Sequence, residues 1–350
     1  MRVIRILFFS ILFAGIAVGL SAQEKVYPKK GDGVTTLLRR YKRNTVEHHK
    51  QFLELNKGKF GKKDALIMGV AYTLPPKKIT ASSPASNQPK AATSSTTASP
   101  TQSGNKGYEP LFGPKLAHYD IISSELKGAT FYLVGGHGGP DPGATARFEN
   151  HTLHEDEYAY DIILRLARNL MMRGARVHII IQDKVDGIRD GRLLANSKRE
   201  TCMGAAIPLN QTARLKQRSD KINQLYNKNK SGYHRAIFVH IDSRSKHQKI
   251  DVFFYHTESS PSKKLANTMR TTFTNKYNRH QPGRGFTGTV SKRNLYVLRN
   301  TEPVGIYAEL ANIQNVSDLR RIIQVDNRQA LANWMCEGFV TDYNQYKKGK

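Results

Sequence analysis

Short apolar runs alternate with longer amphipathic stretches over the C-terminal two thirds of the chain. Six runs predict strands, at residues 130–134, 177–181, 236–240, 252–255, 295–298 and 304–309. Their residues are apolar almost without interruption, as is typical of strands that are buried on both faces of a sheet.

Helices are predicted between these runs. The clearest is a stripe of apolar residues at helical spacing over 159–170, which stops at Gly174, a residue type that favours helix C-termini. Further amphipathic stretches lie at about 215–227, 262–275 and 328–346. The alternation predicts an α/β fold with a mixed, largely parallel sheet of about six strands and helices on both faces. The long polar segment 182–212 is expected to be an insertion or a loop over the end of the sheet.

A separate pattern occupies residues 24–75. Val26 and Tyr27 precede a turn at 30–32, apolar residues recur at helical spacing around 37–41 and 52–55, and an apolar run at 66–74 ends at Pro75. This periodicity predicts a small β-α-α-β domain.

Two segments lack the pattern of a folded core. Residues 1–22 place Arg2 and Arg5 before an apolar run that ends in small residues, which predicts a signal peptide. A retained membrane anchor is the alternative, but the run is short for a spanning helix. Residues 76–107 are rich in Ser, Thr, Ala and Pro, which predicts a disordered linker. We therefore expect an exported protein of the periplasm or cell envelope, without a stable membrane anchor and with a second domain at 108–347.

The charge of the chain indicates its class of partner. Lys and Arg number 55 against 28 Asp and Glu, so the net charge is +27. Such a field attracts polyanions. For an exported protein, anionic wall polymers are more fitting partners than nucleic acid, and we expect no nucleic-acid partner. Cys202 and Cys336 could pair with each other, but two cysteines cannot form a thiolate zinc site, so any metal must be held by histidines and carboxylates.

Chemically distinctive side chains follow the predicted strand ends. The run 130–134 leads into a glycine-rich loop around His137 that fits neither a dinucleotide motif nor a phosphate-binding loop. His240 and Glu309 end two further strands, and Glu155 begins the clearest helix, where the helix dipole alone would favour it. Three neighbours are rivals for the role of Glu155: Glu149, His154 and Glu157. Two histidines and two glutamates at one sheet edge suit a zinc hydrolase, which needs three ligands and a carboxylate that moves protons.

These pieces, in this order, resemble the catalytic domain of zinc-dependent N-acetylmuramoyl-L-alanine amidases of the Amidase_3 type. The likeness covers about 128–345, and the family motif Gly-His-Gly-Gly-x-Asp-x-Gly-Ala matches 136–144. The resemblance implies that Zn²⁺ is bound by His137, Glu155 and His240, that Glu309 is the catalytic proton carrier, and that peptidoglycan is the substrate. The bond cut would be the amide between N-acetylmuramic acid and L-alanine.

The late part of the family pattern suggests two substrate-binding residues, Arg284 and Asn315. The chain also departs from the family. Val134 stands where the family usually has an Asp, which leaves open what orients His137, and Asp242 stands where Asn is commoner.

The N-terminal domain resembles a LysM domain, a module that binds glycans. The likeness rests on Tyr27, the Lys-Gly-Asp turn at 30–32, Asn56, Gly69 and Pro75. The usual Thr-Leu after the turn is replaced by Gly-Val, and a small basic domain of unrelated purpose is the alternative.

Two other functions are compatible with the sequence. One is a non-catalytic wall-binding protein that keeps an amidase fold, and the other is a zinc peptidase that cuts within the stem peptide. The sequence also leaves open whether segment 182–212 blocks the site until a protein activator moves it.

Overall fold

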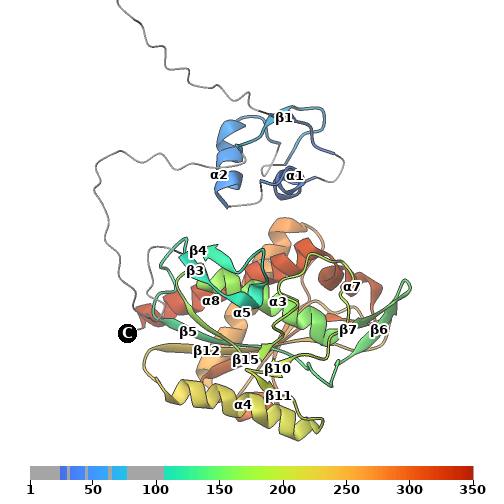
Figure 1. The fold of residues 1–350 in the computed structure, drawn as a ribbon. Helices are drawn as coiled ribbons and strands as arrows, with labels where there is room; N and C mark the ends of the chain where they lie inside the picture. Colours follow the sequence, from blue (N-terminus) through green and yellow to red (C-terminus); the bar gives the residue numbers. More distant parts are fainter. Residues whose placement is uncertain (1–23, 30–31, 44–45, 62–64, 77–105, 350) are drawn as a thin grey trace, which may run out of the picture. The chain divides into compact units, whose positions relative to one another are not determined.

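The computed structural model describes residues 24–29, 32–43, 46–61, 65–76 and 106–349. Contacts divide the chain into two compact units, one within residues 1–96 and one within 97–350 (Figure 1). The predicted signal peptide at 1–22 and nearly all of the predicted linker at 76–107 lie outside the described residues. In the described part, no helix is long and apolar enough to cross a membrane.

The first unit contains two helices and a two-stranded sheet. Its elements are β1 (Lys25–Val26), α1 (Val34–Arg40), α2 (Val46–Leu55) and β2 (Tyr72–Thr73), and β1 pairs with β2 in antiparallel fashion. The order is the predicted one, but the strand expected at 66–74 is shorter, because the chain turns at Gly69, whose φ is +80°. Buried apolar side chains from all four elements, including Leu37, Phe52 and Tyr72, form the core.

The second unit is built around a six-stranded sheet. In their order across the sheet, the strands are β14 (Thr289–Lys292), β13 (Phe253–His256), β15 (Val304–Asn312), β12 (Tyr233–Asp242), β5 (Ala129–Gly135) and β8 (Arg176–Ile179). The last four are parallel to one another, whereas β13 is antiparallel to β15 and parallel to β14. The predicted mixed, largely parallel sheet is confirmed.

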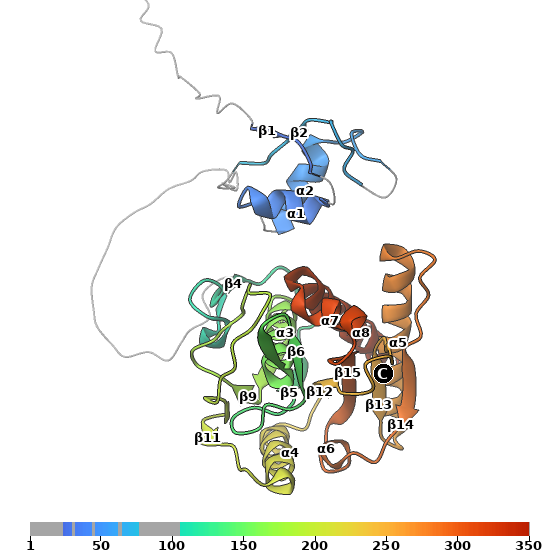
Figure 2. The same ribbon diagram turned by 90° about the vertical axis from the view of Figure 1, so that its right-hand side faces the viewer.

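Helices cover both faces of this sheet, as predicted (Figure 1). One face carries α3 (Glu155–Met171), α5 (Ser260–His280) and α8 (Val325–Lys348), the other carries α4 (Gln211–Asn227) and α6 (Tyr296–Arg299), and α7 (Val316–Ile323) precedes α8. Figure 2 shows α4 and α6 on one side of the sheet and α3 and α8 on the other.

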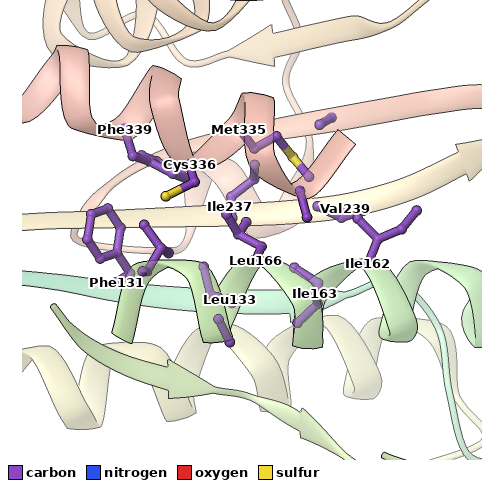
Figure 3. Packing of buried hydrophobic residues seen from close by; sticks show 14 of the residues in the cluster. Phe131, Leu133, Ile162, Ile163, Leu166, Ile237, Val239, Met335, Cys336 and Phe339 are labelled. Atoms are coloured by element: carbon purple, nitrogen blue, oxygen red, sulfur yellow. The ribbon is translucent and has the colours of Figure 1, made fainter. Parts of the chain in front are cut away.

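Alternate side chains of each buried strand enter opposite layers, because successive residues of a strand point to opposite faces. In β5, Phe131 and Leu133 pack with apolar residues of α3 and α8, whereas Tyr132 and Val134 pack with the layer that holds α4 and α6. Figure 3 shows the first layer, in which side chains of β5 and β12 point toward those of α3 and α8. Packing on both faces explains why the strands are apolar throughout.

Smaller sheets flank the main one. β3 (Lys106–Tyr108) pairs with β4 (His118–Asp120) around the 3-10 helix η2 (Pro110–Phe112), and β6 (Thr145–Phe148) pairs with β7 (His151–His154) just before α3. Segment 182–212 adds β10 (Thr201–Cys202) and β11 (Ala205–Ala206) to β9 (Ile181–Gln182). Between β9 and β10 the segment is held by side-chain hydrogen bonds, such as that of Ser197 Oγ to Asp183 (2.8 Å).

The predicted strand at 295–298 is wrong, because residues 296–298 belong to α6 and Leu295 is its N-cap. The amides of Arg299 and Asn300 donate to the carbonyl oxygens of Leu295 and Tyr296, each at 3.0 Å. In a run this short, the periodicity of apolar residues does not distinguish a helix from a strand. The sixth strand is instead β14 at the sheet edge, which the apolar pattern missed because most of its residues are exposed.

The carboxylate of Asp161 on α3 connects two helices of one layer. Its Oδ2 accepts hydrogen bonds from Arg165 Nε (2.8 Å) and from Arg328 Nε on α8 (2.6 Å), and Asp161 and Arg328 are fully buried. Asp161→Asn should lower the free energy of unfolding by about 3–5 kcal/mol, because it leaves buried arginine charge without its partner. Chemical denaturation measures this loss. Asp220→Asn, in an exposed pair with Lys216, is the control, and an equal loss in both variants would contradict the prediction.

Candidate functional site

Parallel strands bring the predicted site residues to one edge of the sheet. The loop after β5 carries His137, while His240 on β12 and Glu309 on β15 are direct partners in the parallel register. Glu155 is the first residue of α3, and its amide donates to the carbonyl of Ala144 in the loop after β5 (2.9 Å). Four side chains from distant parts of the sequence therefore share one region, at the carboxyl ends of the strands, where open α/β sheets place their sites.

Three of these side chains form a compact group. One potential ligand atom each of His137, Glu155 and His240 lies within 4.8 Å of the others. His137 Nε2 is 3.3 Å from Glu155 Oε2, and His240 Nδ1 is 2.9 Å from Glu155 Oε1. Glu155 and His240 are buried, and His137 is partly exposed. The rivals His154, Glu149 and Glu157 are not in this group.

Glycines of the loop after β5 make room for the group. A Cβ on Gly136 would lie 2.4 Å from the His240 ring, and one on Gly143 would lie 2.7 Å from both His137 and Glu155. No side chain fits at such distances, so only glycine allows the backbone to pass this close to the imidazoles. His137 itself has a φ of +58°, which is uncommon for a residue with a Cβ and turns its side chain toward Glu155.

Asp141 orients His137. Its Oδ2 accepts the hydrogen bond of His137 Nδ1 (2.7 Å), which leaves Nε2 for a metal ion. Asp141 is held in turn by Arg214 Nη2 (2.6 Å) and by the amide of Gly143 (3.2 Å). Val134 stands where the family usually has an aspartate near His137. In this chain Asp141, four residues after the histidine, orients His137 instead. Its place within the glycine-rich motif was the sequence signal for it.

Backbone amides and an aromatic ring position the other two members. The amides of Ala144 and Ile241 donate to the two carboxylate oxygens of Glu155, each at 2.9 Å. The His240 ring stacks on Tyr307, with 4.4 Å between the centroids and 14° between the planes. The apolar pattern indicated β15 but gave no sign that Tyr307 supports His240, because that contact depends on the register between two strands.

The charges of the group are coupled. Burial lowers the pKa of His137, but hydrogen bonds to Asp141 and Glu155 outweigh it and raise this pKa to about 10. Burial raises the pKa of Glu155, but hydrogen bonds from His137 and His240 outweigh it and lower this pKa. Burial keeps the pKa of His240 below its usual value. A metal ion must displace the proton from His137, so acid should weaken metal binding.

Glu309 is a buried carboxyl without a full set of partners. It is 9% exposed, and its Oε2 has no hydrogen-bond partner among the described residues. Burial and the nearby carboxylates of Glu155 and Asp242 raise its pKa well above the usual value. Metal-assisted hydrolysis requires a carboxyl group beside the metal ligands that can take up and release a proton, and Glu309 has the position for this role.

The donor atoms of the group fit zinc. Two imidazole nitrogens and one carboxylate make up a ligand set of catalytic zinc sites, in which a fourth position takes water or substrate.

Cys202 and Cys336 are both free and buried, and they belong to hydrophobic clusters on different faces of the sheet, so they do not pair.

The two predicted substrate-binding residues have partners elsewhere in the protein. Arg284 forms an ion pair with Asp251. Asn315 caps α7 by accepting hydrogen bonds from two backbone amides, and its Nδ2 donates to the carbonyl of Lys246 (2.8 Å). Contact of either side chain with substrate stays a prediction.

Comparisons with known proteins find similarity over the second unit. A family model described as N-acetylmuramoyl-L-alanine amidase (Amidase_3) matches residues 132–340. An N-acetylmuramoyl-L-alanine amidase from Clostridium difficile 630 is 18% identical, with a TM-score of 0.45 and coverage of 61% of this chain and 96% of that one. The catalytic domain of an N-acetylmuramoyl-L-alanine amidase from Bacillus (Paenibacillus) polymyxa var. colistinus is 18% identical, with a TM-score of 0.44 and coverage of 61% and 97%.

A third solved structure and the curated proteins complete the comparison. An N-acetylmuramyl-L-alanine amidase from Mycobacterium smegmatis is 16% identical, with a TM-score of 0.45 and coverage of 63% of this chain and 99% of that one. No curated protein sequence matches the chain. Because the family match spans more than half of the 350 residues, the chain belongs to the N-acetylmuramoyl-L-alanine amidase family.

Proposed function

We propose that this enzyme is a zinc-dependent peptidoglycan hydrolase that cuts the amide between N-acetylmuramic acid and L-alanine. Zinc would be held by His137 Nε2, a carboxylate oxygen of Glu155 and His240 Nδ1. The observation that carries the proposal is the convergence of these three donors within 4.8 Å, beside Glu309, whose Oε2 has no hydrogen-bond partner in the described part of the chain. Membership of the amidase family supports the choice of bond.

Glu309 is proposed to move the proton. When bound, zinc would polarise the scissile carbonyl. It would also lower the pKa of water, so that water loses a proton readily as it attacks the carbonyl near neutral pH. Glu309 would accept the proton of the attacking water and pass it to the leaving amine of L-alanine. The raised pKa of Glu309 suits the second step, and positive charge at the triad would favour the carboxylate that the first step needs.

The proposal extends to the N-terminal unit and to the location of the protein. We propose that residues 24–75 form a LysM-like domain that binds glycan strands, and that the protein is exported to the periplasm or cell envelope. Its net charge of +27 would help it hold anionic wall polymers. A protein activator acting on segment 182–212, and a role in wall remodelling or cell separation, are part of this proposal.

The products of digestion test the proposed bond. The full chain, loaded with Zn²⁺, is incubated with purified peptidoglycan, and the soluble products are identified by mass spectrometry. The amidase releases intact stem peptides that begin with L-alanine and glycan that keeps its lactyl group. Peptides shortened within the stem would indicate a peptidase, and wall binding without any product would indicate a non-catalytic protein.

Asp141→Asn should weaken zinc binding by about 10–100-fold, because it removes the charge that orients His137. Competition with a chromophoric chelator measures the zinc affinity. Asp190→Asn, at an exposed aspartate, is the matched control and should bind zinc as the unmodified chain does. Equal affinities for Asp141→Asn and the control would show that Asp141 does not support the ligand.

A further inference from the structure

A second group of buried acidic side chains lies next to the triad. It consists of Asp156 and Glu157, in the first turn of α3, and Glu200, directly before β10. One carboxylate oxygen of each lies within 4.8 Å of the others. The three residues are only 2%, 1% and 5% exposed. None of them has a role in the proposed hydrolysis.

Hydrogen bonds from the protein satisfy two of these carboxylates in part. Glu157 Oε2 accepts from Arg189 Nη1 (2.6 Å), and its Oε1 accepts from the amide of Ser197. Glu200 Oε2 accepts from the amide of Gly139 (2.9 Å), in the loop that carries the triad histidine. These bonds hold both side chains in place and leave lone pairs of the carboxylates free for a further ligand.

The carboxylate of Asp156 indicates, independently of the clustering, that the group lacks a ligand. Its Oδ1 accepts from the amide of Glu157 (2.9 Å), but its Oδ2 is fully buried and has no hydrogen-bond partner among the described residues. The cation bonded to the group in the described part of the chain is Arg189, whose Nη1 is shared with Asp186 (2.8 Å). The dipole of α3 adds only about half a positive charge. Buried carboxylates without compensating charge are strongly unfavourable, so a cation that reaches this group would be strongly stabilised there.

We propose that Asp156, Glu157 and Glu200 bind a hard divalent cation such as Ca²⁺, at a site separate from the zinc triad. A donor set made only of carboxylate oxygens favours Ca²⁺ or Mg²⁺ over zinc, which prefers nitrogen and sulfur. Oxygens within 4.8 Å of one another can surround one ion with Ca–O distances of about 2.3–2.6 Å.

The position of the group indicates what the cation does. Glu200 belongs to segment 182–212, Asp156 and Glu157 belong to α3, and the bond from the Gly139 amide reaches the loop of His137. A single ion would therefore join two pieces of chain, the segment and α3, and Glu200 connects them to the loop beside the triad. Its loss would weaken the attachment of the segment to the helix and loosen the loop that places His137.

Separate measurement of calcium and zinc tests the site. The full chain is loaded with Zn²⁺, equilibrated in metal-free buffer and titrated with CaCl₂, and both metals are counted by mass spectrometry. We expect one Ca²⁺ per chain in addition to zinc. Calcium at about 100 times its dissociation constant should raise the midpoint of thermal unfolding by about 5 °C. MgCl₂ in a parallel titration distinguishes the two hard cations.

Two variants locate the site. Glu200→Gln keeps the acceptor for the Gly139 amide but should lose the bound calcium and its thermal shift while zinc remains bound. Glu258→Gln, at an exposed glutamate paired with Lys292, makes the same chemical change outside the group and should keep both metals. The proposal is overturned if the unmodified chain takes up neither Ca²⁺ nor Mg²⁺ at millimolar concentration, or if Glu200→Gln binds calcium unchanged. Because zinc is counted separately, this failure is distinct from failure of the zinc triad.

Discussion

Glu309→Gln is expected to lower kcat/KM on peptidoglycan by about 10²–10⁴-fold while zinc stays bound. Glutamine keeps the size and polarity of the side chain but cannot accept a proton from water. Glu309 lies beside His240 in the strand register and is not in the group of three potential ligands, so the metal site should survive the substitution. Release of soluble peptidoglycan fragments measures the rate, and elemental analysis measures the zinc.

A matched glutamate elsewhere controls for the substitution itself. Glu302 is exposed and paired with Lys230, and Glu302→Gln should retain the activity of the unmodified chain. Activity of Glu309→Gln within tenfold of this control would mean that another group carries the proton. Loss of zinc from Glu309→Gln would instead show that Glu309 contributes to metal binding.

His240→Ala is expected to leave the chain without stoichiometric zinc and to lower activity by at least about 10³-fold. The imidazole of His240 offers Nδ1 to the ion, and its loss leaves a histidine and a glutamate, too few protein ligands for a catalytic zinc site. Zinc content after dialysis is the direct measurement. Circular dichroism shows whether the variant is folded, since the substitution also removes the ring that stacks on Tyr307.

Removal of an exposed histidine provides the comparison. His247 is exposed, and His247→Ala should bind zinc and cut peptidoglycan as the unmodified chain does. A folded His240→Ala that keeps one tightly bound zinc per chain would exclude His240 as a ligand. A variant that does not fold would require His240→Gln, which keeps more of the side-chain volume.

Much of the fold could be predicted from the sequence, because periodicity reports burial directly. The central strands β5, β12 and β15 are buried on both faces, and their uninterrupted apolar runs marked them. The edge strand β14 is mostly exposed, so it carried no such signal. The short run at 295–298 was apolar because α6 packs on the sheet, and its burial alone did not reveal a helix.

The candidate site, too, could be predicted only in part from the sequence. Strand ends pointed to His137, His240 and Glu309, because parallel strands finish at one edge. Glu155 could be preferred to Glu157 only through its spacing in the family pattern, since both stand in the first helical turn. The structure places them in different groups: Glu155 lies with the two histidines, and Glu157 lies with Asp156 and Glu200.

The sequence by itself determined the order of the buried central strands and the long helices, the residues at the strand ends and the need for non-thiolate ligands. Only the tertiary structure decided which side chains meet: Asp141 with His137, Tyr307 with His240, and Glu200 with the acidic residues of α3. Periodicity and spacing report which residues are buried along one segment. Contacts between distant segments depend on strand register and on how the loops at the sheet edge fold, and these follow from the packing of the whole domain.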